Sequence, residues 1–143
     1  MKVRRSIVAA GAAIVLGTTG ALALPALASA HNASTTLKFT AVTNNAVGFT
    51  SSTGGSQETD VNSTGQTIGF DVVYSTVTGN SALVNVAFDI KGGLLYGTLT
   101  TTNAGKTFTG KVTGGTGTFK GATGTITAKT LPGHKTAITI VYS

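Results

Sequence analysis

The feature that most constrains this chain is a repeated two-residue alternation of apolar and polar side chains. After residue 30, no stretch has apolar residues at helical spacing. The alternation is clearest in residues 68–74 and 82–90. Glycine and asparagine at 79–80 and a glycine pair at 92–93 mark turns, because these residues adopt positive φ at low steric cost. The pattern predicts an all-β fold of short strands joined by tight turns.

About eight strands follow from this alternation. They are expected at 36–41, 46–50, 68–74, 82–90, 93–101, 106–113, 123–130 and 136–142, with a long polar loop at 51–66 and turns at Asn103-Ala104-Gly105 and Pro132-Gly133. Eight antiparallel strands in about 110 residues fit a closed eight-stranded β-barrel. A two-sheet β-sandwich is the alternative, since periodicity alone does not choose between the two.

Residues 1–30 have the three parts of a secretory signal peptide. A basic start precedes an apolar stretch at 7–24, and the small residues Ala28-Ser29-Ala30 form a cleavage site. An uncleaved membrane anchor is the alternative, because the apolar stretch is about as long as a short membrane-spanning helix. We expect cleavage before His31, a single mature domain at 31–143, no membrane attachment after cleavage, and an extracellular, secreted protein. The alanine-rich signal fits a bacterial source.

The composition of the mature chain excludes several functional classes. It has no cysteine, which rules out disulfides, a thiol nucleophile and cysteine-bound metals. Seven scattered lysines and no arginine make nucleic acid an unexpected partner. Its two histidines, His31 and His134, lie at the new N-terminus and in a turn, and neither resembles a general base held by a second group. We expect no metal and no cofactor.

Four acidic residues are the candidates for acid–base chemistry. Glu58 and Asp60 lie in the predicted polar loop, where we expect them to be solvated, and a weak cation site or a glycosidase-type pair is the alternative. Asp71 and Asp89 lie on the polar side of the two clearest strands and are expected to face each other or solvent. If the sides of the first of these strands were inverted, Asp71 would point into the barrel. Desolvation would then raise its pKa and make it the best acid–base candidate.

Several strands carry apolar residues on the side assigned to the exterior. These residues are Val73, Leu83, Leu95, Leu99 and Val141. A monomeric barrel does not need so many exposed apolar side chains, so they indicate a homo-oligomer, either a dimer or a trimer. The alternative is that a bulge shifts the alternation and turns them inward.

The most distinctive stretch is GGTGTFKGATGT, from Gly114 to Thr125. It resembles the glycine-rich segment late in the barrel of dirigent proteins and of the allene oxide cyclase-like family. The matching residues are Gly114, Gly115, Thr116, Gly117, Phe119, Gly121, Ala122 and Gly124. The order of strands agrees over most of residues 35–143. These glycines predict a tight bend, with Phe119 closing one end of the barrel.

The resemblance implies an eight-stranded barrel whose open mouth binds a small apolar or phenolic molecule. Plant members cyclise an unstable fatty-acid epoxide or steer the coupling of phenoxy radicals, often as trimers or dimers, and work mainly by shaping the substrate. The plant enzymes have an acidic residue on the first strand. Residues 37–42 contain none here, which argues against the same activity.

The aromatic residues assigned to the barrel interior are the candidate ligand contacts: Phe39, Phe70, Tyr74, Phe88 and Tyr96. The leading prediction is a cofactor-free barrel that binds a small hydrophobic or phenolic molecule and templates its cyclisation or coupling, and enzymatic activity is left open. The alternative is a non-catalytic structural or cell-surface protein with a filled barrel. A cavity among the aromatic side chains would favour the first reading, and a tightly filled interior would favour the second.

Overall fold

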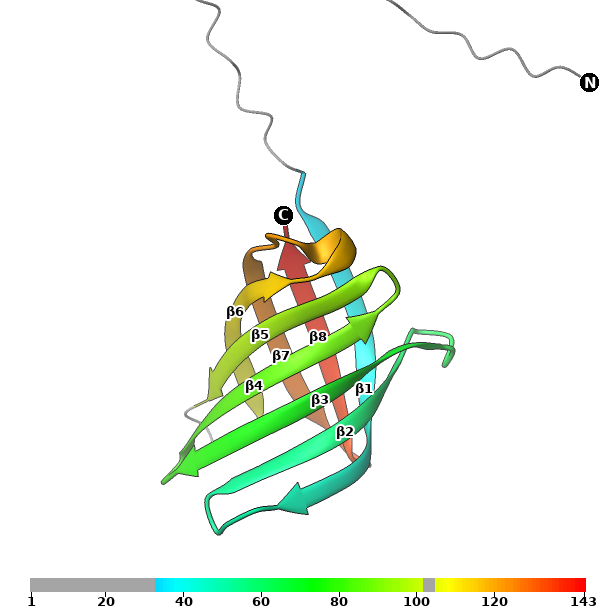
Figure 1. The fold of residues 1–143 in the computed structure, drawn as a ribbon. Coiled ribbons are helices and arrows are strands. Elements are labelled where there is room, and N and C mark those ends of the chain that lie inside the picture. The colour runs from blue at the N-terminus through cyan, green and yellow to red at the C-terminus, as the bar shows by residue number, and fades with distance from the viewer. Residues whose placement is uncertain (1–32, 102–104) are drawn as a thin grey trace, which may run out of the picture. The chain divides into compact units, whose positions relative to one another are not determined.

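The computed structural model describes residues 33–101 and 105–143, which form a closed barrel of eight antiparallel strands (Figure 1). Each strand pairs with the next, and the last strand returns to pair with the first. The prediction of an all-β barrel is confirmed, and the β-sandwich alternative is wrong. The predicted signal peptide and residues 103–104 of a predicted turn lie outside the described residues. No helix in the described ranges is long and apolar enough to cross a membrane.

The strands agree with the prediction along most of the chain. Their bounds are β1 (Thr35–Gly48), β2 (Thr53–Val61), β3 (Thr67–Thr78), β4 (Ser81–Ile90), β5 (Gly93–Thr101), β6 (Thr107–Gly115), β7 (Gly124–Leu131) and β8 (Lys135–Tyr142), with a 3-10 turn η1 (Gly117–Phe119) between β6 and β7. The prediction is wrong over 46–66. The segment at 46–48 continues β1, and most of the expected loop is β2.

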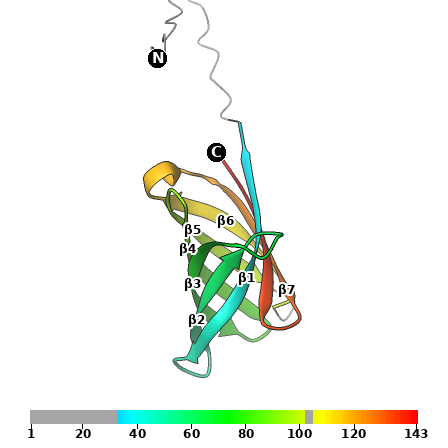
Figure 2. The same cartoon turned by 90° about the vertical axis from the view of Figure 1, so that its right-hand side faces the viewer.

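The length of β1 is what allows the barrel to close (Figures 1 and 2). Its first part pairs with β8, from Thr35 opposite Tyr142 to Val42 opposite Lys135. Its second part pairs with β2, and the register shifts between Thr43 and Asn45. A bulge of this kind bends a strand and increases its twist, so one strand can serve two neighbours around a closed sheet.

The core is made of alternate residues that point into the barrel. Phe39 and Phe88 pack edge to face, with ring centroids 5.6 Å apart. The inward assignment of β4 is confirmed, because Phe88 is 1% exposed and Asp89 lies outside. On β5 the assignment is wrong, since Leu95 and Leu99 are buried. Leu95 pairs with Phe88, and directly opposite residues in an antiparallel ladder share a face.

The glycine-rich motif forms one end of the barrel, next to the C-terminus (Figure 1). Phe119 is 5% exposed and packs edge to face on Tyr142 at 5.5 Å. Gly117 has a φ of 57°, and a Cβ there would meet the carbonyl oxygen of Gly92. Only glycine fits this combination of left-handed backbone and close approach. The motif therefore brings η1 against the start of β5 and buries Phe119 in the barrel.

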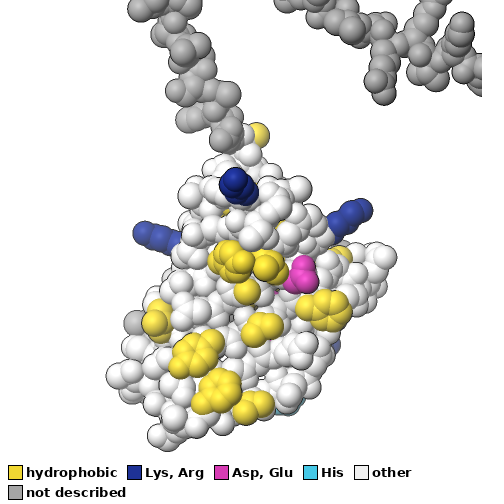
Figure 3. All heavy atoms as spheres, in the orientation of Figure 1, with side chains coloured by type: hydrophobic (Ala, Val, Ile, Leu, Met, Phe, Trp, Pro, Cys, Tyr) yellow, Lys and Arg dark blue, Asp and Glu magenta, His cyan; other side chains and the backbone are white. Residues whose placement is uncertain are grey.

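A group of exposed apolar side chains lies on the outer surface, and we call it the apolar outer face. It consists of Val47, Phe49, Phe70, Val72, Tyr74 and Leu83, whereas the exposed Val77 lies on the inward side of β3, opposite Ala82. Phe49 stacks on Tyr74, with ring centroids 6.1 Å apart. Figure 3 shows apolar side chains spread over the side of the barrel that carries β3 and β4. Of the residues that the sequence assigns to the exterior, Leu83 and Val141 face outward and the other three face inward.

Candidate functional site

The polar face of β3 points into the barrel, the reverse of the predicted orientation. Asp71 is 2% exposed, whereas Phe70 and Tyr74 are 49% and 45% exposed. The prediction that these two aromatic residues point inward is wrong. The alternative in which Asp71 points inward is the arrangement found. Its cause is the register, because Asp71 lies opposite the buried Phe88 of β4.

Two more carboxyl groups enter the barrel from β2. Glu58 is 8% exposed and Asp60 is fully buried, so the prediction of a solvated loop is wrong for both. Their spacing of two residues puts them on one face of the strand. Glu58 lies opposite Asp71, and Asp60 lies opposite Gly69, which has no side chain of its own to fill the space. Three carboxyl groups are thus gathered at one wall of the barrel.

The three carboxyl groups differ in their hydrogen bonds. The hydroxyls of Thr43 and Ser56 donate to Oε1 of Glu58, at 3.1 Å and 2.9 Å. Within the described ranges, no ordinary donor reaches either oxygen of Asp60 or Oδ1 of Asp71. The two aspartates also act on each other's pKa, since a side-chain hydrogen bond between them lowers the pKa of Asp60 and raises that of Asp71. Such a bond needs a proton on one of them, because two carboxylates offer only acceptors.

Burial keeps that proton on Asp71 at neutral pH. Desolvation, and after it the charges of Glu58 and Asp60, together raise the pKa of Asp71 from its usual 3.8 to about 9. The pKa of Asp60 is raised to about 7, mainly by desolvation, with the hydrogen bond from Asp71 lowering it and the charge of Glu58 raising it. All seven lysines of the described ranges are exposed, so none neutralises the cluster from inside.

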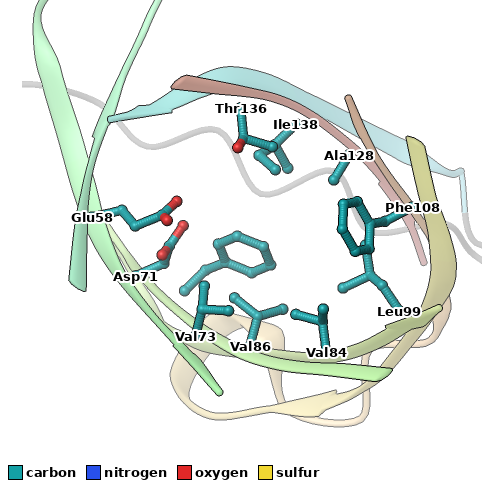
Figure 4. A pocket seen from close by; sticks show the side chains of 11 residues that line it. Glu58, Asp71, Val73, Val84, Val86, Leu99, Phe108, Ala128, Thr136 and Ile138 are labelled. Carbon is teal, nitrogen blue, oxygen red and sulfur yellow. The ribbon is translucent and has the colours of Figure 1, made fainter. Parts of the chain in front are cut away.

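A cavity of about 130 Å³ lies against this wall (Figure 4). Glu58, Asp71 and Thr136 are its polar lining residues. The apolar lining is formed mainly by Val73, Val84, Val86, Phe88, Leu99 and Ile138, with Phe108 and Ala128 beside them. A cavity of about 150 Å³ with apolar walls holds one benzene molecule. The cavity therefore has room for about one ring, with a polar wall on one side.

The cavity adjoins a second hollow at the end of the barrel opposite the glycine-rich motif. This hollow is about 320 Å³ and includes the β3–β4 turn at Gly79 and Asn80. Val84 and Phe108 line both spaces. A molecule entering from this end would pass these two side chains to reach Asp71.

The structure separates the five predicted aromatic contacts. Phe88 lines the cavity, and Phe39 lies buried beside it. Phe70 and Tyr74 belong to the apolar outer face, and Tyr96 lines an outer groove with Tyr74. No residue of the motif from 114 to 124 lines the cavity. The sequence predicted a solvated Glu58 and offered its pairing with Asp60 only as the alternative, and the signal for a buried position was the two-residue spacing of these acids within a segment free of proline.

Among the described residues, no group of three or more His, Cys, Asp or Glu side chains has an arrangement able to hold a metal ion. Carboxyl groups can also carry protons. Two of them, Asp60 and Asp71, share a hydrogen bond, and the third, Glu58, is held by hydroxyl groups.

Comparison with solved structures finds proteins that share this barrel fold. A pyocyanin demethylase is similar with a TM-score of 0.65 and 15% identity, over 76% of this chain and 100% of the other. AbnU, an exo-specific intermolecular Diels-Alderase, has a TM-score of 0.59 and 7% identity, over 77% and 98%. A pterocarpan synthase dirigent protein has 0.53 and 14%, over 78% and 86%. At these identities the likeness establishes the fold alone.

The sequence matches no protein-family model and no curated protein sequence.

Proposed function

We propose that this protein binds a small, mainly apolar or phenolic molecule inside the barrel and exchanges a proton with it through Asp71. The observation that carries this proposal is the buried carboxyl group of Asp71 beside an apolar cavity, where desolvation raises its pKa and favours the neutral acid. A neutral acid in such a site can donate a proton to a developing negative charge on a bound molecule. Asp60 has a pKa of about 7, so the fraction of it that is protonated near neutrality can pass its proton to the ionised Asp71 and restore the acid.

Holding the molecule in one conformation is the second part of the proposed function. The rigid sheet and the close walls favour one folded shape of a substrate, which suits a cyclisation or coupling that needs orientation more than strong chemistry. Membership of the dirigent and allene oxide cyclase-like barrels belongs to the same proposal. It is supported by the GGTGTFKGATGT segment and by the likeness to a dirigent protein. The cavity argues against the alternative of a structural protein, because that alternative expects a barrel interior filled by side chains.

Export and assembly are also proposed. The signal-peptide pattern supports secretion, which a mature mass that begins at His31 would verify. The apolar outer face supports self-association. Its three aromatic residues are about half exposed and together offer roughly 300 Å² of surface, a large share of the ~800 Å² that each partner buries in a standard interface. A second copy of the chain is the partner we propose for this face.

Binding can be tested with 4-methylphenol, whose single ring suits the cavity. Ala128 lines the cavity and Ala137 of the neighbouring strand does not, so Ala128→Leu and Ala137→Leu make a matched pair. We expect isothermal titration calorimetry to detect binding to the wild type and to Ala137→Leu, and a loss of at least tenfold in affinity in Ala128→Leu. Equal affinity for all three proteins would show that 4-methylphenol binds elsewhere and would contradict the proposal.

The natural ligand can be sought by native mass spectrometry of the protein recovered from the medium of its producer. A stoichiometric small molecule that is absent from Ala128→Leu would support the proposal. A ligand-free barrel that also ignores 4-methylphenol would favour the structural alternative.

A further inference from the structure

We propose that the ligand of this cavity carries a protonated amine, with its ammonium group between Glu58 and Asp71 and its apolar part against Val84 and Phe88. This inference rests on the proposed function, because it assumes that the cavity is a binding site. It adds the charge and the polar group of the ligand, which the fold does not determine.

The first argument is that acceptors outnumber donors on the polar wall. Thr136 offers one hydroxyl, against the carboxyl oxygens of Glu58 and Asp71. Oδ1 of Asp71 is buried and has no hydrogen-bond partner in the described ranges. Oε1 of Glu58 is an acceptor for the hydroxyls of Thr43 and Ser56. A ligand that donates hydrogen bonds therefore suits this wall, and an ammonium group offers three N–H donors where a hydroxyl offers one.

The second argument is the charge of the barrel interior. Glu58, Asp60 and Asp71 are the only ionisable side chains among the buried residues of the described ranges, and all three are acids. Strand β4 presents Phe88 opposite Asp71, and β1 presents Ala41 opposite Asp60. A buried carboxylate without a cation is costly, and removal of that cost is the gain that a cationic ligand makes. The lysines cannot provide it, because all of them lie on the exterior.

The third argument is the division of the cavity into a polar wall and an apolar wall. Figure 4 shows Glu58 and Asp71 together on one side, with Val84, Leu99 and Phe108 across from them. An ammonium group attached to one ring by a short link would place its two parts on the two walls. A free metal ion or an inorganic cation would leave the apolar wall empty.

The test compares benzylamine with benzyl alcohol, which differ in the group that meets the acids and little in size. Benzylamine is protonated at pH 7. We expect it to bind the wild type at least tenfold more tightly than benzyl alcohol does. In Glu58→Gln and in Asp71→Asn this preference should fall to within about threefold, because each variant removes an acceptor or a charge at the wall. Asp89→Asn is the matched control, since Asp89 lies on the exterior of β4, and it should keep the preference.

A second readout separates a charged ligand from a neutral one. An ammonium group near the acids lowers their pKa, so its binding should release protons near pH 7, whereas benzyl alcohol should release none. Calorimetry in phosphate and in Tris buffer measures this release, because the two buffers differ in their heat of ionisation. Proton release with benzylamine in the wild type, and less of it in Asp71→Asn, is the expected result.

Three outcomes would overturn the inference. Equal affinity for benzylamine and benzyl alcohol would show that the charge is not recognised. Absence of benzylamine binding at millimolar concentration, with 4-methylphenol still bound, would reject the amine and leave the proposed function intact. Benzylamine binding that survives in Ala128→Leu would place the amine outside the cavity.

Discussion

Replacement of Asp71 by asparagine should stabilise the barrel, and the gain should grow as the pH rises. In the folded protein Asp71 keeps its proton up to a pH of about 9, whereas in the unfolded chain it loses the proton near 3.8. The folded state therefore binds an extra proton between these values. Its contribution to stability is fully present below the unfolded pKa and is lost as the pH rises toward 9. Asparagine has the same shape, cannot ionise and avoids this loss.

The size of the effect follows from the same two pKa values. Each pH unit inside the window changes the free energy of unfolding by about 1.4 kcal/mol for one extra proton. From pH 5 to pH 8 the advantage of asparagine should thus grow by as much as ~4 kcal/mol. Half of this change would still exceed the uncertainty of a denaturant titration, which is about 10–15% of the free energy of unfolding extrapolated to water. Asp60 also makes the free energy of unfolding depend on pH, up to its pKa of about 7. Both the wild type and Asp71→Asn contain Asp60.

The assay is urea unfolding followed by circular dichroism at pH 5, 6.5 and 8. Wild type, Asp71→Asn and Asp89→Asn are compared at each pH. Asp89 is exposed, so its variant should follow the wild type at every pH. The reasoning fails if the difference between Asp71→Asn and wild type is independent of pH, or if the wild type is more stable at pH 8 than at pH 5.

Three further predictions concern the rest of the barrel. Phe119→Ala should lower the free energy of unfolding by about 3–5 kcal/mol, because it empties the packed end beside Tyr142, and a urea titration that shows a loss below 1 kcal/mol would contradict this. Gly117→Ala should lower the stability of the fold several times more than Gly121→Ala does. Both glycines have positive φ, but only at Gly117 would an added Cβ meet a backbone atom, and thermal unfolding of the two variants measures the difference. Val72→Lys should convert an oligomer to a monomer in light scattering, whereas Thr127→Lys on the exposed face of β7 should not, and a wild type that is already monomeric would refute the proposed interface.

The fold could be predicted because its strands repeat one pattern with clear turn residues between them. Strand β4 is the best example. Its alternate residues from Val84 to Ile90 point inward, and its neighbouring turns contain glycine. Strand β2 could not be found in the same way. Its inward residues Ser56, Glu58 and Asp60 are as polar as its outward ones, so no alternation of hydrophobicity marks it.

The site was mispredicted because hydrophobicity was used to choose the inner side of β3. The outer residues Phe70, Val72 and Tyr74 are more apolar than the inner Gly69 and Asp71. A rule that puts the apolar side inward gives the wrong answer where the interior holds a polar wall and the exterior is apolar. Only the pairing of Asp71 with Phe88 settles the orientation, and such pairing is a property of the folded sheet.

The pairing of β1 with β8 also sets when this domain can fold in the cell. The first eight residues of β1 find their partners among residues 135–142 of β8, the last strand of the barrel. Until that segment has left the ribosome, Phe39 has no Ile138 beside it and the sheet cannot complete its circle. Closure of the barrel is therefore delayed until β8 has been synthesised, as expected for a topology dominated by distant contacts.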